Sequence, residues 1–145
     1  MNRRDFLALG AAGTLGLLHE PRASAQEPAP PTVRYGQSRL GISDDDRDAT
    51  LYIPKSYQPG VPMPLMMMLH GFAGTGEGVR GMFPLAEEFG VIMIAPESRG
   101  LTWGRSIPGF DADVRYLGPA YRHVADLVDI DTTRVALGGV SDGAG

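Results

Sequence analysis

Two uninterrupted apolar runs, residues 65–69 and 91–95, place the tightest constraint on how this chain can fold. A strand with one face in water alternates apolar and polar side chains, whereas a continuous apolar run suits a strand covered on both faces. A shorter apolar segment follows at 134–137. Strands of this kind are typical of a mostly parallel sheet with helices on both faces. The sequence therefore predicts an α/β fold.

Helical signals separate these runs. Residues 84–89 begin with a proline, which suits a first helical turn, and end at Gly90, a residue type that terminates helices. Apolar side chains spaced by three and four residues through 111–128 predict one stripe of an amphipathic helix. Because an interior proline removes a hydrogen bond, Pro119 predicts a kink or two shorter helices.

A further strand is expected near the start of this domain. Residues 48–53 alternate with period two and stop at Pro54, and we expect residues 33–35 to pair with them. The acidic residues 44–46 lie between the two segments and predict a solvated turn. The methionines at 63 and 66–68 are expected to fill the core.

Composition excludes several classes of protein. The chain has 145 residues, of which 43% are hydrophobic and 21% charged, so it can form one modest globular domain. It has no cysteine, which excludes disulfide scaffolds and thiolate zinc sites. The formal net charge is −4 and the basic residues are scattered, unlike those of a nucleic-acid binder. No cofactor and no metal are expected.

The first 25 residues have the pattern of an export signal. Arg3 and Arg4 precede an apolar stretch at 6–18, and the small residues 23–25 suit cleavage by a signal peptidase. The paired arginines resemble a twin-arginine signal. The apolar stretch is too short to span a bilayer, so no stable membrane anchor is expected. The alternative is a short amphipathic segment that stays attached.

The expected domain organisation follows from this signal. Residues 1–25 form the signal peptide, residues 26–32 form a proline-rich linker, and residues 33–145 form a partial α/β domain. The expected location of the mature protein is periplasmic or extracellular.

A candidate nucleophile follows the last apolar segment. Gly139, Ser141 and Gly143 form the pattern G-x-S-x-G directly after residues 134–137. In a sharp strand-to-helix turn the serine backbone is strained and its neighbours must lack bulk, which explains the flanking glycines. Such a turn presents the Ser141 hydroxyl above the carboxyl edge of the sheet.

A second motif predicts a binding site for a negatively charged oxygen. His70, Gly71 and Phe72 follow the strand predicted at 65–69. Acyl transfer passes through an intermediate with negative charge on oxygen, which preformed backbone N–H groups stabilise. The expected donors are the amides of Phe72 and Asp142, with Gly71 allowing close approach. His70 is expected to be a buried imidazole that holds this loop by hydrogen bonds.

These motifs carry a family resemblance. Residues 64–143 resemble the first half of the α/β-hydrolase fold, within its group of bacterial esterases, phospholipase/carboxylesterases and polyhydroxyalkanoate-depolymerase-like proteins. The matching pieces are residues 69–72, 95–100, and 129–134 leading into 138–144. The resemblance implies that Ser141 is the nucleophile, that the Asp142 amide is an oxyanion donor, and that the substrate is a neutral or aromatic ester.

The same fold places its triad acid and histidine after the serine, and here the sequence continues for only four residues beyond Ser141. We expect an N-terminal portion of a larger hydrolase, inactive alone, with residues 134–137 as an exposed apolar edge. His123 is expected at the surface of its helix or between helices, and Glu97 and Asp113 are expected to be solvated acids. The oligomeric state is left open.

Two other functions remain possible from the sequence. Gly76, Gly78 and Gly81 match G-x-G-x-x-G, with Glu97 at the spacing of a ribose-binding acid. Six residues separate this motif from the preceding strand, so a glycine-rich loop at the rim of the site is favoured over a dinucleotide site. A noncatalytic binding module or pseudoenzyme is the other alternative. Trp103 and Phe72 are candidates for a substrate pocket or for aromatic packing under a loop.

Overall fold

The computed structural model describes residues 32–103 and 110–145. The chain divides into two units, Met1–Pro30 and Pro31–Gly145, and the fold below belongs to the second. The predicted signal peptide and all but the last residue of the predicted linker lie outside the described residues. Within the described part, no helix combines the length and apolar character needed to cross a membrane.

The centre of the fold is a mixed sheet of five strands in the order β1-β2-β4-β3-β5. The apolar runs form its parallel part, in which β3 pairs with both β4 and β5. The pairs β1–β2 and β2–β4 are antiparallel. The expectation of a mostly parallel sheet is therefore correct only for β3, β4 and β5. The strands are β1 (Gly36–Arg39), β2 (Thr50–Ile53), β3 (Met63–Leu69), β4 (Ile92–Ala95) and β5 (Ile130–Gly139).

The partner of β2 differs from the prediction. Residues 33–35 were expected to pair with it, but the pairing strand is β1, in register from Gly36 opposite Ile53 to Arg39 opposite Thr50. Leu40, the residue directly after β1, explains this register. The Leu40 side chain is only 5% exposed, and its N–H donates to the Ala49 carbonyl at 2.8 Å. Burial of Leu40 therefore anchors the hairpin.

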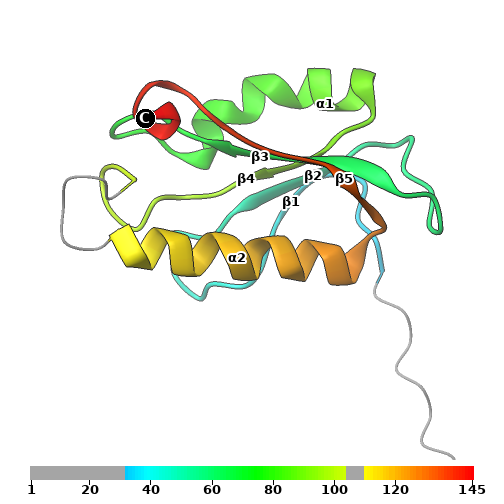
Figure 1. Cartoon of the computed structure of the whole chain (residues 1–145), viewed down its shortest axis with the longest axis horizontal. Coiled ribbons are helices and arrows are strands. Elements are labelled where there is room, and N and C mark those ends of the chain that lie inside the picture. Colours follow the sequence, from blue (N-terminus) through cyan, green and yellow to red (C-terminus); the bar gives the residue numbers. More distant parts are fainter. Residues whose placement is uncertain (1–31, 104–109) are drawn as a thin grey trace, which may run out of the picture. The chain divides into compact units, whose positions relative to one another are not determined.

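Two α-helices cover opposite faces of the sheet (Figure 1). The helix α1 (Phe83–Phe89) ends at Gly90, which has φ 62° and provides the left-handed cap that the sequence predicts. The helix α2 (Phe110–Leu127) runs through Pro119 as one element, so of the two predicted outcomes, a kink or two shorter helices, the second is wrong. Pro119 is exposed, and its neighbour Ala120 is packed in the core.

Alternate residues of β3 supply two separate cores. Leu65 and Met67 pack on the α2 side, whereas Met66 and Met68 pack on the α1 side, as the core role predicted for the methionines requires. On the α2 side of the neighbouring strand, Leu137 is 63% exposed. β5 is the last strand in the sheet order of the described residues, so its apolar edge is exposed, as expected.

Candidate active site

The carboxyl ends of β3, β4 and β5 lie at the same edge of the sheet, because these strands run parallel. At that edge, β5 continues into a sharp turn. Val140 N–H still donates to the Leu69 carbonyl at 3.0 Å, and Ser141 then begins the 3-10 helix η2 (Ser141–Ala144). Ser141 has φ 52°, a conformation that non-glycine residues rarely adopt. The backbone of the candidate nucleophile is therefore strained.

Both glycines of the motif are needed for the packing of this turn. A Cβ at Gly139 would collide with the backbone of Gly143. A Cβ at Gly143 would lie 2.6 Å from the His70 carbonyl oxygen and 2.8 Å from that of Leu69, closer than real contacts allow. The turn after β5 therefore packs directly on the end of β3. A side chain at Gly143 would separate the two, and one at Gly139 would open the turn itself.

The loop after β3 touches the serine turn. A Cβ at Gly71 would lie 3.4 Å from Ser141 Cβ and 3.3 Å from the Val140 carbonyl oxygen. Phe72 follows directly, with a side chain that is 66% exposed, and the described residues accept no hydrogen bond from its amide. The Asp142 amide lies in the first turn of η2, where N–H groups have no partner within the helix. Gly71 and η2 thus place both predicted oxyanion donors in segments adjoining Ser141.

The orientation of the Phe72 amide is set through its own peptide group. The Gly71 carbonyl accepts hydrogen bonds from His70 Nδ1 at 2.7 Å and from the Gly74 amide at 2.9 Å. In a trans peptide the N–H points away from the C=O of the same unit. Fixing the Gly71 oxygen therefore fixes the direction of the Phe72 N–H.

His70 is a structural imidazole in this geometry. Its side chain is 2% exposed, and the Ser98 amide donates to Nε2 at 3.1 Å. Nε2 accepts this bond, so the proton lies on Nδ1, which donates to Gly71. Both ring nitrogens are occupied by the backbone. The other described histidine, His123, lines a cavity with Leu51 and Ile53, and no residue of η2 lines that cavity.

The two acids that were expected to be solvated are not. Asp113 is 4% exposed and accepts a 2.6 Å hydrogen bond from the Arg99 amide. Glu97 is only 20% exposed and accepts from the Gly76 amide at 2.6 Å. Each carboxylate satisfies a backbone N–H of a loop at the carboxyl edge, which explains its burial.

Trp103 is buried beside the loop that follows β3. It is 7% exposed, its indole N–H donates to the His70 carbonyl at 2.7 Å, and its ring centroid lies 4.8 Å from that of His70. Its ring also forms one wall of a cavity of about 630 Å³. Both predicted roles of Trp103, packing and pocket lining, therefore fit its position, whereas Phe72 does not line the cavity.

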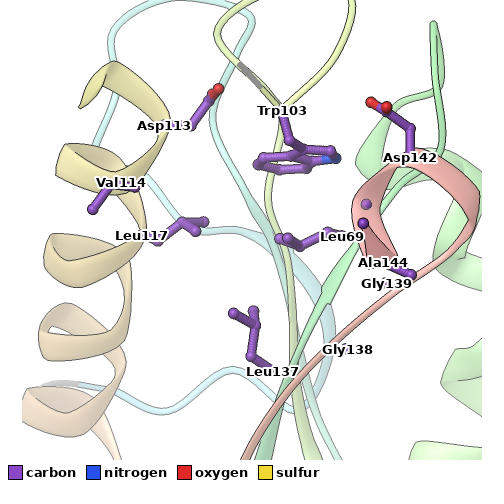
Figure 2. Close-up of a pocket in the computed structure, with 12 residues that line it drawn as sticks. Leu69, Trp103, Asp113, Val114, Leu117, Leu137, Gly138, Gly139, Asp142 and Ala144 are labelled. Atoms are coloured by element: carbon purple, nitrogen blue, oxygen red, sulfur yellow. The ribbon is translucent and has the colours of Figure 1, made fainter. Parts of the chain in front are cut away.

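The cavity lies between α2 and the turn after β5, and Figure 2 shows Leu69, Leu117 and Leu137 directed into it beside Trp103. Asp142 and Gly143 also line it, so it reaches η2. Its walls are mainly apolar. The cavity can hold the uncharged part of a small molecule next to the turn, or a side chain of a neighbouring segment.

The second glycine motif does not form a nucleotide site. Gly76, Gly78 and Gly81 lie in the 3-10 helix η1 (Gly76–Met82), so the rim segment expected as a loop is helical. A Cβ at Gly76 would lie 2.6 Å from the Ala95 carbonyl oxygen. Glu97, the candidate ribose ligand, is bonded to the Gly76 amide. The first glycine therefore packs against β4, and its amide is already bonded to the acid that a ribose would need.

Behind the site, a polar network joins the first hairpin to α2. Asp48 is 6% exposed and accepts hydrogen bonds from Arg39 Nε at 2.9 Å, the Gly41 amide at 2.5 Å and the Tyr116 hydroxyl at 2.8 Å. Burial raises the pKa of Asp48, but these hydrogen bonds outweigh it and the net pKa is lowered. Burial, followed by the bond to Asp48, raises the pKa of Tyr116.

Comparison with known proteins identifies the fold. No family model matches the sequence, and no curated protein matches it. Among solved structures, the chain is similar to an acetyl xylan esterase from Aspergillus awamori, with 21% identity, a TM-score of 0.59, and coverage of 74% of this chain and 42% of that one. It is also similar to a thermophilic esterase from Thermogutta terrifontis with bound propionate, with 19% identity, a TM-score of 0.56, and coverage of 75% and 42%.

The chain thus spans less than half the length of the esterases it resembles. At this level of identity the similarity shows a shared fold, consistent with the α/β-hydrolase-like architecture that the motifs imply.

Proposed function

We propose that this chain carries the nucleophile and the oxyanion-binding loop of a serine hydrolase that cleaves carboxylic esters. The observation that carries the proposal is the positive φ of Ser141 at the end of β5, in a turn packed against the loop that contains Phe72. A strained serine between two obligatory glycines is the arrangement that exposes a nucleophile at a sheet edge. The esterase folds found among solved structures agree with it.

The proposed reaction follows from this arrangement. Ser141 Oγ attacks the ester carbonyl carbon, and its proton passes to a general base. The resulting oxyanion accepts hydrogen bonds from the Phe72 and Asp142 amides, and losing one such donor costs about 3 to 4 kcal/mol. The alcohol leaves with the proton, and water then cleaves the acyl-serine to release the acid and restore Ser141.

Neither histidine in the described part of the chain is placed to act as a general base for Ser141. Both nitrogens of His70 are bonded to the backbone, and His123 lines a cavity with residues of β2. A serine hydroxyl without a base is a weak nucleophile at neutral pH. We therefore expect the 145-residue chain alone to react slowly.

The proposed substrate is a neutral ester whose apolar part packs beside Trp103 and Leu69. The mainly apolar walls of the cavity suit an uncharged group, and the carboxylates of Asp113 and Asp142, which also line it, disfavour an anionic one. The bound propionate of one similar esterase and the acetylated substrate named for the other point to small acyl groups. We propose that residues 1–25 export the protein, so that it meets its substrate outside the cytoplasm.

A fluorophosphonate probe tests the proposal. We expect slow phosphonylation of the chain at Ser141, identified by mass spectrometry of peptides and absent in Ser141→Ala. Added imidazole should accelerate the reaction by acting as the missing base.

Ser38 provides the internal comparison, because it is partly exposed in β1, away from the turn. Equal labelling of Ser38 and Ser141, or unchanged labelling in Ser141→Ala, would contradict the assignment and favour a noncatalytic binding module.

A further inference from the structure

The proposed oxyanion loop consists of residues 70–74, which follow β3. It is bonded to a neighbouring segment, residues 98–103, which we call the brace. Three hydrogen bonds join them. The Ser98 amide donates to His70 Nε2 at 3.1 Å, the Trp103 indole donates to the His70 carbonyl at 2.7 Å, and the Ala73 amide donates to the Leu101 carbonyl at 2.7 Å. The brace therefore contacts the loop on both sides of Phe72.

The hydrogen bond from the Ser98 amide also determines the tautomer of His70. It makes Nε2 of His70 an acceptor, which leaves the ring proton on Nδ1. Nδ1–H can then donate to the Gly71 carbonyl, and that bond, together with the one from the Gly74 amide, orients the Phe72 amide. If the brace withdrew, the tautomer would no longer be fixed, and the Gly71 carbonyl would keep only the hydrogen bond from the Gly74 amide to hold the direction of the Phe72 amide.

The loop needs such support because its backbone is strained. Ala73, next to Phe72, has φ 52°, a left-handed conformation for a residue with a Cβ. Such a conformation persists only where the surrounding structure holds it. The bond from the Ala73 amide to Leu101 supplies part of that hold.

The brace is itself fixed from outside the site. Arg47, in the exposed segment before β2, donates through Nη1 to the Ser98 carbonyl at 2.6 Å and to the Gly100 carbonyl at 2.7 Å. The Ser98 hydroxyl also donates to the Gly100 carbonyl at 2.7 Å. One guanidinium thus holds two backbone carbonyls of the brace, a segment without regular secondary structure.

We infer that Arg47 is a positioning residue for the oxyanion loop, acting through the brace. This inference rests on the proposed function for its catalytic consequence, but the mechanical link can be measured separately. Arg99 anchors the same segment in two ways: its backbone amide donates a hydrogen bond to Asp113, and its guanidinium stacks 4.2 Å from the centre of the Tyr116 ring. Loss of Arg47 should therefore loosen the brace while the fold persists.

Amide hydrogen exchange in the 145-residue chain tests the link. In Arg47→Ala we expect the Ser98 and Ala73 amides to exchange about tenfold faster or more, since both cross between brace and loop. The Val91 amide, which is bonded to Ala86 at the end of α1, should not change. Arg47→Lys keeps a cationic donor and should restore part of the protection.

Arg122→Ala is the matched control, because Arg122 is an exposed arginine on α2. It should leave the Ser98 and Ala73 amides unchanged. Unfolding midpoints in urea for all three variants separate local opening from lost stability. Unchanged exchange of Ser98 and Ala73 in Arg47→Ala would overturn the inference, and so would equal acceleration of Val91.

The fluorophosphonate reaction reports the catalytic consequence. Phosphonylation of Ser141 should be about 10- to 100-fold slower in Arg47→Ala than in the unsubstituted chain, with intermediate rates in Arg47→Lys. Faster amide exchange with an undiminished labelling rate would show that the brace does not position the donors. Absence of labelling in the unsubstituted chain would contradict the proposed function instead, and the exchange rates would still decide the role of Arg47.

Discussion

Gly143 has no room for a methyl group, since a Cβ there would press on the carbonyl oxygens of His70 and Leu69. Gly143→Ala must push the serine turn away from β3, and we expect the free energy of unfolding to fall by about 1–3 kcal/mol. Urea denaturation followed by circular dichroism measures this.

Gly78→Ala is the control for this substitution, because nothing lies within 4 Å of a Cβ at Gly78. We expect a change within about 0.5 kcal/mol. Equal effects of the two substitutions would show that the turn is not packed as closely as described.

Asp48 links acidity to stability. Its hydrogen bonds lower its pKa in the folded chain despite burial. A lowered folded pKa gives stability that is present above the unfolded pKa, about 3.9, and is lost as the pH falls through the folded value. Asp48→Asn should therefore lower the free energy of unfolding by about 1–3 kcal/mol at pH 7, with a smaller deficit at pH 3.

Urea denaturation at pH 7 and pH 3 checks this, with the exposed Asp44→Asn as control. A deficit for Asp48→Asn that is the same at both values would contradict a role for its charge.

The residues of the site differ in how far the sequence could predict them. Gly71, Gly139 and Gly143 were identified because steric crowding in a tight turn depends on local spacing. The role of Arg47 was not, because it arises from contacts with backbone carbonyls 51 and 53 residues away. Any donor with the right reach could make these bonds, so no sequence pattern marks them. The catalytic roles of Ser141, Phe72 and Asp142 stay predictions.

At the level of elements, α2 contains a proline where the helix would be more stable without it. Pro119 cannot donate a backbone hydrogen bond, and an interior proline costs about 3 kcal/mol in an exposed helix. Pro119→Ala should therefore raise the free energy of unfolding by about 1–3 kcal/mol. Thermal denaturation should show a higher midpoint.

Pro84→Ala offers a comparison within the same chain. Pro84 lies in the first turn of α1, where its missing N–H would have no helical partner anyway. Its replacement should leave the midpoint unchanged or lower it slightly. A midpoint that rises equally in both variants would point to the unfolded chain as the source of the effect.

The helices also show where local signals stop being informative. The end of α1 was predictable because Gly90 marks it by itself. The continuity of α2 was not, since Ala120 and Val124 are fully buried against the sheet and this packing outweighs the local cost of Pro119. The position of β1 depended in the same way on burial of Leu40, a contact that the period-two pattern of β2 does not reveal.

At the scale of the whole domain, the edge strand β5 is the part of the described fold that we expect to cause self-association. Leu137 and Val135 lie on the α2 side with 63% and 43% of their surface exposed. An apolar edge with free backbone groups pairs readily with other chains. We expect concentration-dependent self-association, reduced in Leu137→Lys, and light scattering across a dilution series measures it.

Val61→Lys is the control, since Val61 is 56% exposed in the loop before β3. It should not reduce association to the same degree. Equal reduction by both would indicate that added charge alone, and not the edge, is responsible.

The α/β class could be predicted from the sequence because each continuous apolar run, taken by itself, indicates a strand that is covered on both faces. The order of strands and the antiparallel placement of β1 and β2 were not, as these depend on which edges meet across the whole domain. The fold class was thus predicted more completely than the sheet was.

Because the backbone of Ser141 is left-handed, stability and the presence of a hydroxyl group favour different residues at this position. Glycine would adopt that conformation without strain, so Ser141→Gly should make the domain more robust while removing the only hydroxyl in the turn. Under the proposed function, durability and reactivity thus favour different side chains at residue 141, and a lineage that no longer needed that chemistry would be free to settle on the smaller one.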